Sequence, residues 1–228
     1  KDVSFELKEG EILGFAGLMG SGRTELARAL IGADPKTSGK IFFHDKEVNI
    51  ESPADAVDAG IGYLSEARKK YGLLLIQDVT FNIALASLKK FTNKLGFYKK
   101  SPAVGIAKEG IKTLGIKTPS ERQYLKNLSG GNQQKVVISK WLARDCEVLI
   151  FDEPTRGIDV GAKDEIYKLL TRLASEGKSV IMISSELPEV LRLSDRIAVM
   201  CEGRLTGIVE NKDADQNSIM QLATKFRD

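Results

Sequence analysis

The glycine-rich stretch at residues 17–24 constrains the fold more than any other part of the chain. It follows a short apolar run at residues 12–16 and precedes an amphipathic run at residues 24–31 that stops at Gly32. A short apolar run bounded by glycine is typical of a buried strand, and apolar residues three and four apart mark one face of a helix. The sequence therefore predicts a strand, a tight turn and a helix at this point.

Predicted strands and helices also alternate further along the chain, before and after its middle part. Residues 40–45 and 47–50 predict a hairpin, Ser52 and Pro53 open a helix that reaches Ala59, and residues 61–64 predict a strand. Further strands are predicted at residues 148–151, 180–184, 196–200 and 204–209, and further helices at residues 162–175 and 187–193. Apolar strands that alternate with helices imply an α/β fold whose mainly parallel sheet is covered on both faces.

The middle of the chain has a different character. Between about Glu66 and Gln134 strand signals are missing, lysines occur in pairs, and helices are predicted at residues 80–88 and 102–114. We expect a mobile, charged stretch at residues 91–101, and we interpret the lysine pairs as a solvated face. This pattern predicts a core of residues 1–65 and 136–228 with a helical subdomain at residues 66–135.

Composition excludes some classes of function. A chain of 228 residues suits one domain with a subdomain, and a net charge of +3 is too small to indicate nucleic acid as the partner. Cys146 and Cys201 lie in or beside apolar runs, which predicts buried thiols. No apolar run approaches the roughly 20 residues of a membrane helix and no signal peptide is evident. The start at Lys1 leads us to expect a domain of a longer protein.

The glycine-rich turn has the spacing of a phosphate-binding loop with one change. Gly17, Gly22 and Thr24 fit the pattern G-x-x-x-x-G-K-[ST], but Arg23 stands where that pattern has lysine. Backbone N–H groups in such a loop surround phosphate oxygens, and the threonine hydroxyl is placed to bind Mg²⁺. The candidate nucleotide-binding residues are Gly17, Leu18, Met19, Gly20, Ser21, Gly22, Arg23 and Thr24. A glycine-rich turn without a ligand is the alternative.

Paired acids at the end of a predicted strand favour the phosphate-binding interpretation. Asp152 and Glu153 directly follow the apolar run at residues 148–151. Ligands bind at the carboxyl ends of parallel strands, where an aspartate can hold Mg²⁺ and a neighbouring glutamate can orient an attacking water. We therefore predict that Thr24 and Asp152 are metal ligands and that Glu153 is the general base.

A second anion-binding turn lies at residues 128–133. A Ser-Gly-Gly sequence that opens a helix presents backbone N–H groups, a hydroxyl and the positive end of the helix dipole to an anion. This turn is built to contact a nucleotide held by another domain. It consists of Leu128, Ser129, Gly130, Gly131, Asn132 and Gln133.

In this order the motifs resemble those of the ATP-binding cassette (ABC) ATPases over nearly the whole chain. The turn at residues 128–133 resembles the family's signature motif, and Gly157, Ile158 and Asp159 resemble its D-loop. Ser185 stands where that family has its switch histidine. The resemblance implies a P-loop NTPase fold with a mainly parallel core, an antiparallel β portion and a helical subdomain, and it implies ATP and Mg²⁺ as cofactors.

Three stretches narrow the resemblance to the second of two fused cassettes in bacterial monosaccharide importers of the ribose/galactose type. They are residues 63–70, 132–135 and 184–190. The resemblance implies ATP hydrolysis coupled to sugar uptake at the cytoplasmic face of the inner membrane. The implied partners are a second cassette fused N-terminally, a membrane permease docked on the helical subdomain and, indirectly, a periplasmic sugar-binding protein, with no nucleic acid.

Three positions depart from the working pattern of the family. Arg23 replaces the loop lysine, Glu66 stands where the Q-loop glutamine is expected, and Ser185 replaces the switch histidine. A planar guanidinium is not equivalent to a compact ammonium, and a carboxylate near phosphates adds like charge. In the family each ATP lies between one cassette's phosphate loop and the other's signature turn. The changes thus predict a degenerate site in this chain, with weak activity alone, and an intact signature turn for the partner.

Other functions stay open beside this one. The chain could be a regulatory cassette that binds ATP without hydrolysing it, or Arg23 could serve as an adequate lysine and both sites could turn over. A soluble family member in translation would favour an intact lysine, glutamine and histidine. One in DNA repair would need a long coiled coil between the phosphate loop and the signature turn, where no sustained heptads occur.

Overall fold

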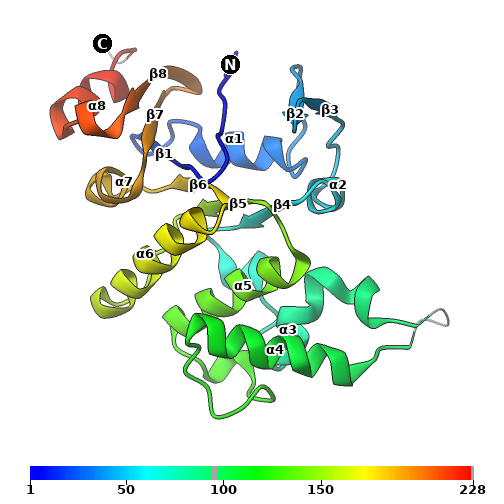
Figure 1. Cartoon of the computed structure of the whole chain (residues 1–228). Coiled ribbons are helices and arrows are strands. Elements are labelled where there is room, and N and C mark those ends of the chain that lie inside the picture. Colours follow the sequence, from blue (N-terminus) through cyan, green and yellow to red (C-terminus); the bar gives the residue numbers. More distant parts are fainter. Residues whose placement is uncertain (94–96, 227–228) are drawn as a thin grey trace. The chain divides into compact units, whose positions relative to one another are not determined.

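The computed structural model describes residues 1–93 and 97–226, which form two compact units (Figure 1). The first unit consists of residues 1–63, 147–154 and 170–228, and the second of residues 64–146 and 155–169. The chain therefore leaves the first unit and returns to it twice. Among the described residues, no helix has both the length and the hydropathy that crossing a membrane requires.

The largest sheet of the described residues is mainly parallel, as the sequence predicts. Its strands lie in the order β4-β5-β6-β1-β7-β8 (Figure 1). They are β1 (Ile12–Gly17), β4 (Ile61–Leu64), β5 (Val148–Asp152), β6 (Ser179–Ile183), β7 (Arg196–Cys201) and β8 (Arg204–Glu210). Strand β1 pairs in parallel with both β6 and β7, and β8 runs antiparallel to β7. This sheet and its antiparallel edge confirm the predicted fold class.

Successive residues of β1 point to opposite faces of the sheet. Leu13 and Phe15 lie in an apolar core with residues of α1 (Arg23–Leu30) and α2 (Pro53–Asp58). On the other face, a Cβ on Gly14 would lie 2.8 Å from a methyl carbon of Val190, in helix α7 (Leu187–Leu193). The absence of a side chain at Gly14 therefore lets α7 approach the strand closely.

The first unit also contains several short elements outside the central strands. Strands β2 (Ile41–Phe43) and β3 (Lys46–Val48) form the predicted hairpin, whose turn contains His44 at φ 48°. The Ser52 hydroxyl accepts a hydrogen bond from the Asp55 backbone N–H, which caps α2 as predicted. Strand β6 begins and ends one residue earlier than predicted. The sequence analysis missed helix α8 (Gln216–Ala223), which follows the short helix η4 (Asn211–Asp213).

The second unit is helical over the residues that the structure describes. Its longest helices are α4 (Lys100–Leu114) and α5 (Gly130–Arg144), with α3 (Val79–Ala84), η1 (Arg68–Gly72), η2 (Leu85–Phe91) and η3 (Leu125–Asn127). Helix α6 (Val160–Ser175) begins in this unit and ends in the first. The predicted helix at residues 80–88 is interrupted, because Ser87 leaves helical geometry.

The charged stretch expected at residues 91–101 is only partly described, since residues 94–96 lie outside the described part. Phe91 is buried and packs with Ala84, Ala103 and Ile106, so this end of the stretch belongs to a core. Both cysteines are buried as thiols, as predicted.

Candidate functional site

The carboxyl ends of three adjacent parallel strands meet at one edge of the first unit. Ile183, the last residue of β6, is paired with Phe15 of β1 on one side and with Asp152 of β5 on the other. The phosphate-loop residues follow β1, Glu153 follows β5, and Ser184 and Ser185 follow β6. The sheet therefore gathers three segments that are far apart in the sequence, at the edge where parallel sheets bind ligands.

Two glycines of the loop are required by its geometry. Gly17 has φ 152°, and a Cβ there would lie 2.4 Å from the Met200 carbonyl oxygen. Gly22 has φ 98° and caps the N-terminus of α1, where a Cβ would lie 3.0 Å from the Cα of Gly203. A side chain at either position would push the loop away from β7 and from the turn that follows it.

Arg23 turns back into the loop that contains it. One terminal nitrogen of its guanidinium donates to the Gly17 carbonyl at 2.5 Å and to the Ser184 carbonyl at 3.0 Å. The residue is 9% exposed. Burial lowers the pKa of Arg23, and the carboxylates of Glu153 and Asp152 oppose that shift. The guanidinium is therefore a buried cation that joins the phosphate loop to the segment after β6.

The two predicted metal ligands lie together. The Thr24 hydroxyl donates to an Asp152 carboxylate oxygen at 3.1 Å, and the Tyr63 hydroxyl donates to the other oxygen at 2.8 Å. Burial raises the pKa of Asp152, and the hydrogen bonds from Tyr63 and Thr24 counteract that rise. A hydroxyl beside a carboxylate is an all-oxygen donor pair, which fits Mg²⁺ completed by phosphate oxygens and water.

Glu153 occupies an unusual backbone conformation beside this pair. Its φ is 51°, in the left-handed region that residues with a side chain rarely adopt, and its N–H donates to the Ile183 carbonyl at 2.9 Å. The Ser185 hydroxyl donates to its carboxylate at 3.0 Å. Burial raises the pKa of Glu153, and the nearby Asp152 charge raises it further. A carboxyl group held at this edge with a raised pKa suits proton acceptance.

The signature-like turn lies in the second unit and caps its own helix. The Ser129 hydroxyl accepts a hydrogen bond from the Asn132 side-chain amide at 2.8 Å and from the Asn132 backbone N–H at 3.5 Å. The Gln133 amide donates to the Leu125 and Leu128 carbonyls, which fixes the loop before the helix. Ser129 itself is exposed, whereas Gly131 in the first turn of α5 is buried.

Glu66 and the D-loop-like residues also lie in the second unit. Glu66 forms an ion pair with Arg156, the residue before Gly157. Ile158 is buried, and Asp159 accepts a hydrogen bond from the Ala162 backbone N–H at 2.9 Å. The structure therefore brings together Arg23, Thr24, Asp152, Glu153 and Ser185 in one unit, and Glu66, residues 128–133 and residues 157–159 in the other.

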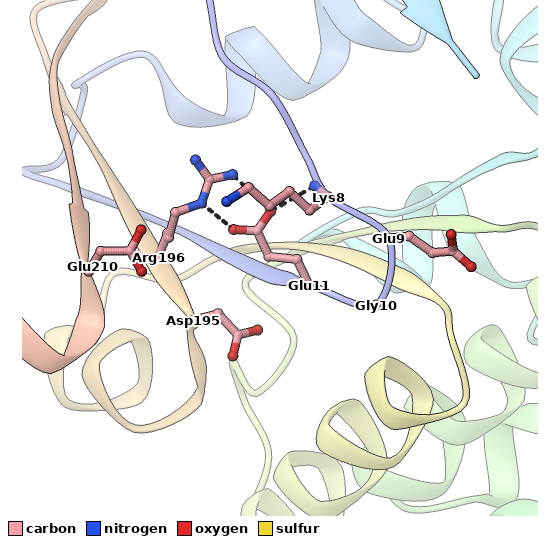
Figure 2. A pocket seen from close by; sticks show the side chains of 7 residues that line it. All are labelled: Lys8, Glu9, Gly10, Glu11, Asp195, Arg196 and Glu210. Carbon is pink, nitrogen blue, oxygen red and sulfur yellow. Dashed lines mark hydrogen bonds and ion pairs between the residues drawn. The ribbon is translucent and has the colours of Figure 1, made fainter. Parts of the chain in front are cut away.

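A cavity of about 260 Å³ lies at the opposite end of the strands from the phosphate loop (Figure 2). Figure 2 shows the side chains of Arg196 and Glu11 pointing toward each other. Their nitrogen–oxygen distance is 2.5 Å. Burial raises the pKa of Glu11, but the hydrogen bonds from Arg196 and the Lys8 backbone outweigh it and leave the pKa lowered. This ion pair joins two of the charged residues that line the cavity, which lies apart from the phosphate loop.

Sequence reasoning missed three residues that contact the candidate site segments. They are Tyr63, which bonds Asp152, and Arg68 and Arg156, which join segments of the second unit. Tyr63 is the third residue of the apolar strand β4. Its hydroxyl, which needs a hydrogen-bond partner when buried, was the only feature of that strand that indicated a polar contact. The contacts of Arg68 and Arg156 join residues about 90 positions apart, which no local pattern predicts.

Comparison with known proteins places this geometry in a family. The family model described as "ABC transporter" matches residues 1–156 of the chain. A putative ribose/galactose/methyl galactoside import ATP-binding protein 1 of Burkholderia lata is 60% identical over 99% of this chain and 44% of its own length. The ribose import ATP-binding protein RbsA of Clostridium tetani is 54% identical over 99% of this chain and 45% of its length. The chain thus spans about half the length of the curated relatives it matches.

Solved structures agree at the level of the fold. The cbiO1 protein of Clostridium perfringens, part of the ABC transporter complex cbiONQ, has a TM-score of 0.78 at 23% identity, over 99% of this chain and 87% of its own. A bacterial ABC transporter cassette solved as a dimer has a TM-score of 0.77 at 23% identity, over 92% of this chain and 90% of its own. With the sequence matches, these likenesses show that the chain belongs to the ABC transporter family and has the fold of its ATP-binding cassettes.

Proposed function

We propose that this chain is an ATP-binding cassette domain of a sugar importer, which couples binding and hydrolysis of ATP to uptake of a monosaccharide. The gathering of the phosphate loop, the Thr24–Asp152 pair and Glu153 at one sheet edge is the observation that carries the proposal. The importer names of the relatives that match 99% of the chain support the transport role.

Backbone N–H groups from Gly20 to Thr24 are proposed to surround the β-phosphate of ATP. Thr24 and Asp152 would hold Mg²⁺, which neutralises developing charge on the phosphate oxygens when bound. Glu153 is the general base for the attacking water wherever this site hydrolyses ATP, and Ser185 orients its carboxylate through the 3.0 Å hydrogen bond.

The site of this chain is proposed to be degenerate. Arg23 is larger than lysine and donates to two backbone carbonyls, so it must leave both to reach a phosphate. Ser185 is short and uncharged, so it supplies no cation at the γ-phosphate. Both features favour retention of ATP over its hydrolysis. The same features favour the second candidate function, a regulatory cassette that binds ATP without turnover.

The turn at residues 128–133 is proposed to complete the ATP site of a second cassette. Its Ser-Gly-Gly sequence opens helix α5, and Ser129 at the start of that helix is exposed. Since the curated relatives are about twice as long as this chain, we propose that the second cassette is fused N-terminally in the parent protein.

The second unit is proposed to dock a membrane permease, which places the domain peripherally at the cytoplasmic face of the inner membrane. Residues 75–78 and 124–126 run side by side through hydrogen bonds that include Lys126 N–H to the Leu75 carbonyl. Ile76 and Tyr124 on these segments are 75% and 52% exposed. Apolar side chains exposed in this way suit burial under a partner. A periplasmic sugar-binding protein would then deliver the sugar to that permease.

Steady-state ATP hydrolysis tests this function. The chain should turn over little ATP alone and should stimulate turnover when it is mixed with the N-terminal half of its parent protein. Ser129→Arg should abolish that stimulation without changing nucleotide binding by the chain itself, because Ser129 serves the partner's site. Rapid turnover by the chain alone would contradict the degenerate site, and a failure of the mixture to exceed the sum of its parts would contradict the paired function.

A further inference from the structure

Arg68 lies at the centre of the second unit's contacts with the signature-like turn and the D-loop-like segment. One terminal nitrogen of its guanidinium donates to the Arg156 carbonyl at 2.9 Å, and the other lies 3.5 Å from the Gly157 carbonyl. The second nitrogen also lies 2.9 Å from the position that a Cβ on Gly130 would occupy. The same Cβ position is 3.2 Å from the Gly157 carbonyl oxygen. One side chain therefore bonds the D-loop-like segment and lies close to the signature-like turn.

A second link joins the same parts of the chain. Glu66, two residues before Arg68, forms an ion pair with the Arg156 side chain. Both groups of this pair are partly exposed, so we expect it to contribute less than the Arg68 bonds. Glu66 is thereby engaged by the segment that precedes Gly157, within its own unit.

We propose that Arg68 is a positioning residue that holds the turn at residues 129–131 and the segment at residues 156–159 in one fixed arrangement, so that both meet the partner's nucleotide together. The proposal rests on the proposed function of the turn. The guanidinium suits this role because its forked donors bond two successive carbonyls of one segment, Arg156 and Gly157, while one terminal nitrogen lies close to Gly130 of the turn. Gly130 suits it as well, because any side chain there would displace the guanidinium.

Hydrogen exchange on the chain alone tests the arrangement without any partner. Arg68→Met keeps the aliphatic stem and removes the donors, and Arg122→Met is the control, since Arg122 is an exposed arginine of the same unit. We follow the N–H groups of Asn132 and Gln133, which bond Ser129, and the N–H of Ile158, which bonds the Thr155 carbonyl. We expect Arg68→Met to speed amide exchange about tenfold in both segments together, with helix α4 unchanged. Faster exchange in only one segment, in neither, or throughout the unit would overturn the proposal. Arg68→Lys carries the same test if Arg68→Met does not fold.

Kinetics in the parent protein test the consequence for the partner's nucleotide. Misplacing groups around a reacting centre lowers kcat more than it raises KM, so we expect Arg68→Met to reduce kcat about tenfold with KM for ATP changed less than about threefold. An equal loss through KM alone would overturn the positioning role. If the unsubstituted pair shows no stimulated turnover, the paired function fails, and the exchange experiment still decides the role of Arg68.

A double substitution sharpens the assignment. Gly130→Ala should displace the Arg68 guanidinium and lower kcat through the same contact. The double variant Gly130→Ala with Arg68→Met should therefore lose no more activity than the worse of the two single variants. Fully additive losses would show that the two residues act independently and would overturn the proposal.

Discussion

At the scale of single residues, the identity of residue 23 has the largest effect on the contacts within the candidate nucleotide site. A lysine would reach phosphate as a compact charge, whereas Arg23 is buried and already bonded to the Gly17 and Ser184 carbonyls. The contact to Ser184 is one consequence of the longer side chain. It ties the phosphate loop to the residue before Ser185, which is itself bonded to Glu153. One substitution therefore changes the contacts of two segments.

Arg23→Lys should restore part of the turnover at this chain's own site. We expect a rise of about tenfold or more in ATP hydrolysis, measured in the parent protein with the partner's general base removed. The matched control is Arg23→Lys with Glu153→Gln, which should return hydrolysis to the starting level. No rise would indicate that Arg23 already acts as an adequate lysine or that Ser185 and Glu66 limit the rate.

Lys140 of helix α5 predicts a pH dependence of stability. Its ammonium is buried and donates to the Gly72 carbonyl at 2.9 Å, and burial lowers the pKa of Lys140 to about 8. Between that value and the ordinary pKa of about 10.5, the unfolded chain binds a proton that the folded chain has lost, so stability rises with pH in this window. Lys140→Met should remove that rise in chemical denaturation curves, and Lys112→Met, at an exposed position of α4, should keep it.

The Glu11–Arg196 pair predicts a second rise of stability with pH, this one in the acid range. Because the pKa of Glu11 is lowered in the fold, its stabilisation is present above its unfolded pKa and is lost as pH falls through the lowered value. Arg196→Met leaves a buried carboxylate without its partner and should cost about 3 kcal/mol of unfolding free energy at neutral pH. The difference from the unsubstituted chain should shrink in acid. A constant difference at every pH would contradict this account.

At the scale of elements, replacing glycine by alanine should lower the stability of the chain at one position and raise it at another. A Cβ on Gly14 in β1 would lie 2.0 Å from the Ser194 hydroxyl oxygen, whereas a Cβ on Gly105 in α4 would meet nothing within 4 Å. Gly14→Ala should therefore destabilise the chain by about 2 kcal/mol, because α7 must move away from the sheet. Gly105→Ala should stabilise it by about 0.5–1 kcal/mol through helix propensity. Thermal denaturation of both variants measures the two signs.

The elements that the sequence predicts well are those with strong local signals. Adjacent residues predict the β1 strand, the loop with its glycines and the apolar β5 strand. The observed ends of these two strands differ from the predicted ends by no more than one residue. Helix α8 was missed because its polar residues obscure the apolar face, although Asp215 and Ser218 form a capping box at its start. The interruption at Ser87 was missed because it depends on tertiary packing, with its hydroxyl bonded to the Ala143 carbonyl.

The site could be predicted in part for the same reason. Thr24, Asp152 and Glu153 were recognisable because each stands at the end of a predicted element, and parallel strands bring such ends to one edge. The bond of Tyr63 to Asp152 and the contacts of Arg68 depend on which segments pack together, and residue type alone does not give that. The bonds of Arg23 to backbone carbonyls likewise need the folded loop to be seen.

At the scale of the whole molecule, we propose that the two units carry parts of two different ATP sites. The first unit contains Arg23 and Ser185, two of the three departures that we propose for the family pattern, with Asp152 and Glu153. The second contains Glu66, the third departure, and the turn at residues 128–133. We therefore expect the parent protein to be asymmetric, with one site that retains ATP and one that hydrolyses it.

Counting bound nucleotide tests this asymmetry most directly. The parent protein, saturated with radiolabelled ATP and Mg²⁺, would be separated rapidly from free nucleotide during turnover, and the retained ATP and ADP would be quantified. We expect intact ATP to be retained at the site of this chain and ADP to form at the partner's site, with Arg23→Lys shifting the retained ATP toward ADP. Equal conversion of both bound nucleotides to ADP in the unsubstituted protein would contradict this expectation.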